Sequence, residues 1–261
     1  MSVTSISIID FLIILFFVNK VNFNLELAVF IYIYIVSLCS TFALWYIAKG
    51  LRHLEISTAI PLLSFGPAIV AIISWIFLKE SLTNKSIFGI LLIVAGSYIL
   101  ETDHKISDLS EPFKKIMRSR YIHYIFSALF LFAIAVTLDR YILSNQSINI
   151  NITTYLFFIL LFNMLNFLIL INVFYKGFPS IMESFRSNFK WFFLTSALGI
   201  VATVFFYKAV SIQLISMVYP ILKANSLFST IIGGGLFHEH KLFLKSIALI
   251  VMLIGGYLVI G

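Results

Sequence analysis

The chain has 261 residues, of which 61% are hydrophobic and 11% are charged, and its mean hydropathy is +1.06. A water-soluble domain carries roughly 25% charged residues, so this composition excludes a soluble globular fold and indicates a protein that spans the lipid bilayer several times. The net charge of +7 lies in short segments between apolar runs. This placement is typical of charge that sets membrane topology rather than of a nucleic-acid-binding surface.

Nine apolar segments follow one another along the chain. A helix needs about 20 apolar residues to cross the hydrocarbon of a membrane. The segments cover residues 5–19, 27–48, 57–78, 85–101, 121–143, 153–175, 191–208, 214–236 and 242–260. A long charged connector at 102–120 separates four of them from five. The sequence therefore predicts an all-α polytopic membrane protein with about nine transmembrane helices.

An internal repeat appears when residues 49–98 are placed over residues 208–257, an offset of 159. Ten of the fifty positions are identical without a gap, and they include Lys49 with Lys208, Ser57 with Ser216, Pro61 with Pro220 and Glu80 with Glu239. Five predicted spans separate the two copies, and an odd number turns the second copy upside down in the membrane. Inverted repeats with broken helices are typical of secondary transporters, which bind their solute near the midplane.

Residues 43–100 resemble the last three helices of an EamA-type unit of the drug/metabolite transporter superfamily. The stretch has a helix that ends in a short basic turn, a proline-containing helix that ends in Lys-Glu, and a closing helix with Gly89 and Gly96 seven residues apart. Residues 206–260 repeat this pattern, with Ala248 in place of the first glycine. The first half is also similar to the four-helix small multidrug resistance proteins. The resemblance implies two inverted repeats, at 1–101 and 121–261, joined by the 102–120 linker.

The chain departs from this family pattern in two ways. EamA-type members usually have ten spans, so the resemblance implies that the first repeat here lacks its first helix. Ten-span members are also expected to keep both termini in the cytoplasm, which would place the 102–120 linker outside. The distribution of lysine and arginine indicates the opposite, because twelve of them lie on the side of that linker and four on the other. By the positive-inside rule the linker is cytoplasmic.

An ionisable residue near the middle of a span costs about 3 kcal/mol to insert. Lys223 occupies such a position, and Tyr219, four residues earlier, lies on the same helix face. Ser64 matches Lys223 in the repeat, and this asymmetry favours a role in binding the solute or in coupling. The alternative is a structural ion pair between Lys223 and Asp10 or Asp139.

Arg140, Asn163 and Asn166 also lie within predicted spans. The side chain of Arg140 is long enough for its charged group to reach the membrane surface. The residues predicted to bind the solute are Lys223, Tyr219, Asn225, Asp139, Trp45, Tyr46, Ser64, Phe206 and Asp10. The residues predicted to break helices or to gate the cavity are Pro61, Pro67, Pro220, Glu80 and Glu239. For the two glutamates, capping of a neighbouring loop or pairing with lysine is the alternative.

No catalytic, cofactor or metal motif is present in the sequence. His238 and His240 are two residues apart, which places them on nearly opposite faces of a helix, and no further ligands lie nearby in the sequence. We therefore expect no enzyme activity, no cofactor and no bound metal.

The sequence predicts a secondary transporter of a small organic metabolite or drug-like solute. Its partners would be the solute, the lipid bilayer and a coupled proton or counter-solute. A plasma membrane location, the inner membrane in bacteria, is expected. Two alternatives are an accessory membrane subunit that transports nothing and an intramembrane lipid-modifying enzyme.

The charge distribution makes the side on which the linker lies testable. A cysteine placed at Ser119 should stay unlabelled by a membrane-impermeant thiol reagent in intact cells, because the linker is expected in the cytoplasm. Labelling should appear once the cells are permeabilised. Ready labelling of intact cells would contradict this orientation and favour the usual family topology.

Overall fold

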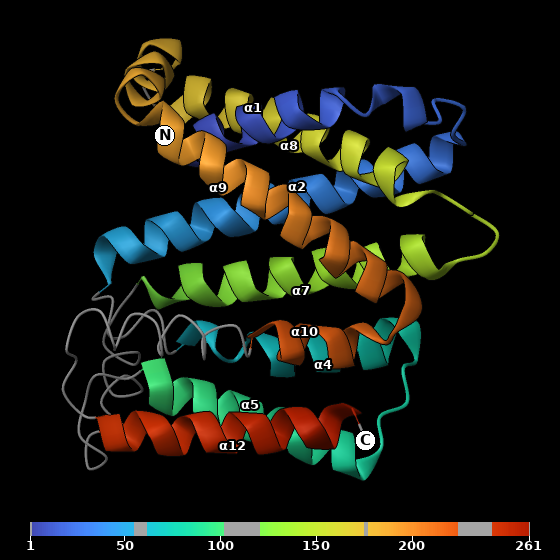
Figure 1. Ribbon diagram of the computed structural model, residues 1–261, viewed down its shortest axis with the longest axis vertical. Helices are drawn as coiled ribbons and strands as arrows, with labels where there is room; N and C mark the ends of the chain where they lie inside the picture. The colour runs from blue at the N-terminus through green and yellow to red at the C-terminus, as the bar shows by residue number, and fades with distance from the viewer. Residues whose placement is uncertain (1, 55–61, 102–120, 175–176, 224–241, 261) are drawn as a thin grey trace. The chain divides into compact units, whose positions relative to one another are not determined.

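The computed structural model describes residues 2–54, 62–101, 121–174, 177–223 and 242–260 (Figure 1). Within these ranges the chain forms nine α-helices, one short 3-10 helix and no strand. They are α1 (Ser2–Leu15), η1 (Val18–Lys20), α2 (Leu27–His53), α4 (Gly66–Leu78), α5 (Asn84–Glu101), α7 (Ile122–Ser144), α8 (Ile152–Phe174), α9 (Phe178–Ile212), α10 (Ile215–Lys223) and α12 (Leu242–Ile260). Each predicted span overlaps one of these α-helices, so the prediction of an all-α membrane fold is confirmed.

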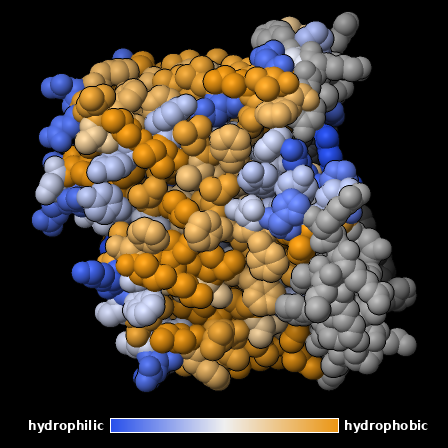
Figure 2. Space-filling view, turned by 180° about the vertical axis from the view of Figure 1, so that it is seen from behind, coloured by the Kyte–Doolittle hydropathy of each residue, from blue (hydrophilic) through white to orange (hydrophobic). Residues whose placement is uncertain are grey.

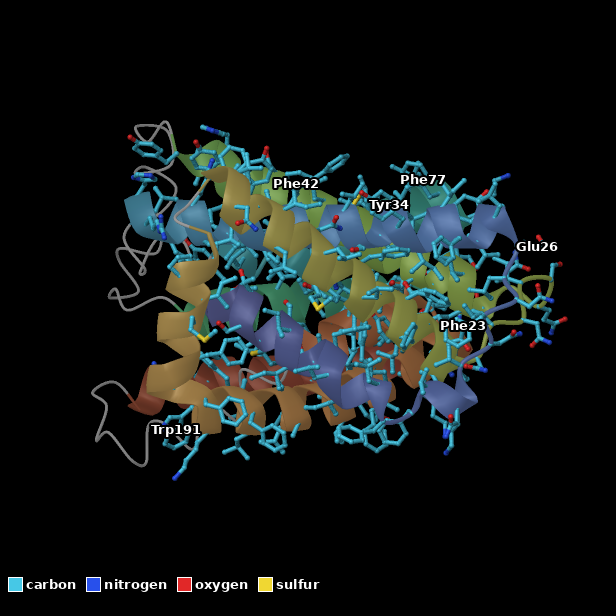
Figure 3. The ribbon with its side chains drawn as sticks, turned by 90° about the horizontal axis from the view of Figure 1, so that it is seen from above. Phe23, Glu26, Tyr34, Phe42, Phe77 and Trp191 are labelled. Carbon is cyan, nitrogen blue, oxygen red and sulfur yellow. The ribbon has the colours of Figure 1, made fainter. Side chains whose placement is uncertain are left out.

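Large apolar side chains cover much of the outer surface. On the face that Figure 2 shows, most of the surface is hydrophobic and the hydrophilic side chains gather near its margins. Phe77 and Trp191 are each 70% exposed and point away from the helices that carry them (Figure 3). Among the residues that the structure describes, four helical segments, α2, α7, α8 and residues 188–212 of α9, are long and apolar enough to cross a membrane. Lipid is the solvent that such a surface requires.

Helix α9 is longer than the predicted span at 191–208. It begins at Phe178 and runs to Ile212, and its backbone leaves helical geometry at Asn188, with φ −133° and ψ 20°. The part that can cross a membrane starts at this break. A hydropathy scan detects long apolar runs. The ten residues before the break include Glu183 and Arg186 and are too polar to be predicted as part of a span. The predicted boundaries therefore mark the membrane-crossing part and miss the rest of the helix.

The chain forms two compact units. Unit 1 comprises residues 1–42 and 138–212, and unit 2 comprises residues 43–137 and 213–261. In unit 1, α1 packs against α8 and α9; in unit 2, α5 packs along α12, and α10 packs against α4 and α5 (Figure 1). Two of the three boundaries fall within α2 and α7 and the third lies between α9 and α10, so each unit contains residues from both halves of the sequence. The division into two sequence repeats stays a prediction.

A side-chain cap marks the start of α8 in unit 1. The side-chain oxygen of Asn151 accepts a hydrogen bond of 2.6 Å from the backbone N–H of Thr154, which is the usual way to cap the first turn. The hydroxyl of Thr154 in turn accepts the backbone N–H of Asn22 at 2.9 Å. From this start, Tyr155, Asn163 and Asn166 follow at helical spacing and share one face of the helix.

Glycines bring α5 and α12 into close contact in unit 2. A Cβ on Gly89 would lie 2.6 Å from the carbonyl oxygen of Gly255, and a Cβ on Gly255 would lie 2.7 Å from that of Gly89. A Cβ on Gly96 would lie 2.9 Å from the carbonyl oxygen of Ala248. The helices are therefore antiparallel, with backbones so close that only glycine fits at these sites.

The contact between α5 and α12 is reciprocal in the 159-residue register. The register pairs Gly89 with Ala248 and Gly96 with Gly255, while the structure places Gly89 against Gly255 and Gly96 against Ala248. A twofold relation between two copies of one helix produces this type of contact, since residue i meets residue j and j meets i. The glycine pair that the sequence singled out thus joins the closing helices of the two predicted repeats.

Two adjacent glycines of α12 give a matched test of this packing. We expect Gly255→Ala to lower the melting temperature of the purified protein, because overpacking against a backbone carbonyl costs about 1–3 kcal/mol. Gly256→Ala is the control, since nothing lies within 4 Å of its Cβ position and alanine is the better helix former. Equal melting temperatures for the two variants would contradict the close approach of α5 and α12.

Candidate functional site

A carboxyl group is buried inside a membrane-spanning helix of unit 1. Asp139 of α7 is 3% exposed, and its carboxylate accepts a hydrogen bond from the hydroxyl of Tyr155 on α8. Tyr155 is fully buried and packs edge-to-face against Tyr207 of α9, with ring centroids 5.1 Å apart. Three helices therefore enclose one acidic group, which the sequence predicted as a candidate site residue.

Arg140, next to this acid, binds the end of α9. Its Nη1 donates a hydrogen bond of 2.6 Å to the carbonyl oxygen of Val210. Val210 lies in the last turn of α9, where carbonyl groups have no partner within the helix. Asp139 and Arg140, adjacent in sequence, thus bind different helices.

A second acid of unit 1 lies on α1. The Asp10 side chain is half-buried and lies near Ser196 of α9. The hydroxyl of Ser196 also lies 3.4 Å from the carbonyl oxygen of Ile6 on α1. Asp10 therefore lies where α1 meets α9. Its carboxyl group falls inside a predicted span.

A cluster of neutral polar side chains joins α2 and α8 in unit 1. The Asn163 Oδ1 accepts a hydrogen bond of 2.9 Å from the Ser37 hydroxyl, and the Ser40 and Thr41 hydroxyls each lie 3.3 Å from it. The Asn166 Nδ2 donates to the Ser37 hydroxyl at 2.9 Å. Asn163 is the twelfth of the 23 residues of α8, so this α2–α8 polar cluster lies near the middle of its span.

Several members of these groups were not predicted as site residues. Tyr155 and Tyr207 are two of twelve tyrosines, and nothing local in the sequence distinguishes them. The signal for the α2–α8 polar cluster was present, because Ser37, Ser40 and Thr41 have the spacing i, i+3, i+4 of one helix face.

The predicted pair on α10 in unit 2 is described only in part. Tyr219 is buried and packs against Phe132, with ring centroids 5.6 Å apart, and it lies 3.3 Å from the Cβ position of Gly66. Lys223 is the last residue of α10. Its side chain and the whole of Asn225 lie outside the described residues, so the role of Lys223 stays a prediction.

Trp45 and Tyr46 belong to an aromatic group at one end of α2 in unit 2. The Lys49 ammonium lies 3.5 Å from the centroid of the Trp45 ring and 5.7 Å from that of Tyr124. The Tyr46 ring stacks on Tyr124, with centroids 5.8 Å apart. Cation–π contact accounts for the position of the lysine.

The remaining predicted residues are spread over both units. Ser64 is fully buried in unit 2, and Phe206 of unit 1 lies beside Tyr207, with ring centroids 5.4 Å apart. Pro67 lies in the first turn of α4, where a missing N–H leaves no helical bond broken, whereas Pro220 lies inside α10. Pro61 and Glu239 lie outside the described residues.

Glu80, a predicted gating residue, caps α10 in unit 2. Its carboxylate accepts hydrogen bonds from the backbone N–H groups of Ile215 and Ser216 at 3.0 and 3.2 Å, and from the Ser216 hydroxyl at 2.5 Å. These N–H groups open α10 and have no partner within it, and negative charge is favourable there. The capping alternative considered from the sequence is therefore the observed arrangement. Lys79 before it adopts φ 53°, the left-handed conformation common where helices end.

Metal-ligating side chains do not gather in groups of three or more in the described part of the chain. The His-Glu-His segment at 238–240 lies outside the described residues.

The comparison with known families assigns the first part of the chain. Residues 2–102, which are less than half of the chain, match the EamA-like transporter family. The resemblance that the sequence motifs predicted is thereby confirmed. Together with the apolar helices, the match supports an integral membrane protein.

Two further likenesses were found. A stretch of 44 residues is 48% identical to part of the uncharacterized protein MJ1333.1 of Methanocaldococcus jannaschii, and it covers 17% of this chain and 32% of that protein. A protein of known crystal structure matches the fold with a TM-score of 0.71 and 13% sequence identity, over 99% of this chain and 88% of its own. At that identity, the likeness shows a shared fold alone.

The contribution of Glu80 can be measured by removing its carboxylate. We expect Glu80→Ala to destabilise the protein by about 2–3 kcal/mol, because buried backbone donors lose a charged acceptor. Glu26→Ala removes an exposed acid beside the start of α2 (Figure 3) and should change stability by less than about 0.5 kcal/mol. Thermal unfolding in detergent compares the two, and equal effects would contradict the capping role.

Proposed function

We propose that this member of the drug/metabolite transporter superfamily is a secondary transporter that carries a small organic solute across the plasma membrane by alternating access. In this proposal the chain performs transport rather than catalysis, and its partners are the solute and the surrounding lipid. A proton or a counter-solute would drive the movement.

The observation that carries the proposal is the buried carboxyl group of Asp139. An acidic side chain within a membrane span is expensive to insert, and such residues typically mark solute or ion pathways. Asp139 is 3% exposed, and its carboxylate is held by the Tyr155 hydroxyl. A purely structural span would be more stable with an apolar residue at this position.

The reciprocal packing of α5 against α12 supports the alternating-access part of the proposal. Inverted repeats give a transporter two related conformations, one open to each side of the membrane. The contacts of Gly89 with Gly255 and of Gly96 with Ala248 follow the pattern expected for two such repeats.

Uptake into proteoliposomes tests the proposal. The wild-type protein should accumulate at least one solute from a panel of radiolabelled amines, acids, amides and sugars. Asp139→Asn keeps the shape of the side chain but removes its charge, and we expect it to lower the rate at least tenfold or to change the preferred solute.

Thr203→Val is the matched control for the Asp139 variant. The Thr203 hydroxyl is exposed and donates to the carbonyl of Gly199 in its own helix at 2.8 Å, so its loss should leave uptake unchanged. Wild-type transport by Asp139→Asn would contradict a role for this acid. An absence of uptake for every solute would contradict the function itself.

A further inference from the structure

The α2–α8 polar cluster has more hydrogen-bonding groups than its own contacts use. The Asn163 Oδ1 is surrounded by three hydroxyl groups, but no partner for the Asn163 Nδ2 occurs among the described residues. Asn166 gives one N–H to Ser37, and its Oδ1 likewise has no partner within the described part of the chain. Two adjacent carboxamides therefore retain a donor and an acceptor.

Helix packing alone does not explain these two carboxamides. Polar side chains that hold membrane helices together bond to the neighbouring helix, and the Ser37 hydroxyl already does so with both asparagines. A further amide group without a partner in hydrocarbon costs several kcal/mol. Asn163 is half-buried rather than enclosed, so its N–H groups have access to space beyond the helix contact.

The depth of the cluster in the membrane matches that of a transported solute. Asn163 lies halfway along α8, and Ser37 and Thr41 lie near the middle of α2. Secondary transporters bind their solute near the midplane, between helices. The cluster is therefore placed where such a site is needed.

The chemistry of the cluster selects against charged solutes. Its five side chains are two carboxamides and three hydroxyls. Tyr155, which holds Asp139, precedes Asn163 by eight residues on α8, or about 12 Å along the helix axis. A donor and an acceptor side by side are complementary to the same pair on a neutral ligand, as when asparagine binds the edge of a base.

We propose that Asn163 and Asn166 form a binding site for the uncharged carboxamide or lactam group of the transported solute. The proposal rests on the transport function proposed above and adds the class of solute. A site built around hydrogen bonds discriminates strongly against analogues that lack the matching group, because its own polar groups are then left without partners. Neutral amides should therefore bind more tightly than the corresponding acids.

Thermal stabilisation of the purified full chain tests binding without transport. The probes are nicotinamide, benzamide and uracil, with nicotinate and benzoate as the matched acids. We expect at least one amide or lactam to raise the melting temperature, and the acids to have no effect. Asn163→Leu should weaken that binding by 10- to 100-fold, while Thr203→Val leaves it unchanged. Stabilisation by acids alone, or by no probe, would overturn the proposal.

A second variant keeps the test valid if Asn163→Leu fails to fold. In a Cys39→Ala background, a cysteine at Asn163 should react with a small water-soluble thiol reagent, and the amide that stabilises the wild-type protein should slow this reaction. A cysteine at Leu165, two residues away and 43% exposed, should react much more slowly, because we expect this apolar position to face lipid. Equal reactivity at both positions, or no protection by the amide, would overturn the proposal.

Uptake of the same probes separates this inference from the proposed function. Amide uptake that falls with Asn163→Leu supports both. Transport of amines or acids that is unaffected by Asn163→Leu would overturn the amide site and leave the transport function intact. Amide binding lost in Asn163→Leu, with no uptake of any solute, would support the site and contradict the transport function.

Discussion

The hydrocarbon core of a membrane offers no hydrogen bonds, so every polar group of this chain that lies there depends on a partner within the protein. The carboxylate of Glu80 satisfies the opening N–H groups of α10, and Arg140 satisfies a carbonyl at the end of α9. The hydroxyl of Tyr155 donates a hydrogen bond to the carboxylate of Asp139. These contacts join separate helices, and they determine which helix ends and faces can meet.

Hydropathy predicted the helices well because lipid imposes one simple requirement on every span. The same requirement explains where the prediction failed. The first ten residues of α9 are helical but include charged and polar side chains, so a scan for apolar runs does not detect them. The spacing of Gly89 and Gly96 on α5 was recognisable in the sequence. The contact of Gly89 with Gly255 on α12 became evident only from the structure.

The sequence predicted only part of the candidate site. An acid in an apolar run is conspicuous, so the sequence predicts Asp139 as a site residue, but its hydrogen-bond partner Tyr155 lies 16 residues away on another helix. Asn163 and Asn166 were recognised as polar, yet their importance depends on which of their atoms bond to Ser37 and which do not. Pro67 was predicted to break a helix. The structure places it in the first turn of α4, where a proline interrupts no helical hydrogen bond.

The reciprocal contact of α5 and α12 also bears on how such a chain can evolve. In two identical subunits, a change from glycine at this interface would appear on both sides at once, and both crowded contacts would be lost together. Within a single chain the two sides mutate separately. Ala248 stands where the register has Gly89, opposite a retained Gly96. A single chain that carries two related helices thus permits an asymmetry that a symmetric dimer could not acquire stepwise, and the same freedom extends to the residues that bind a solute.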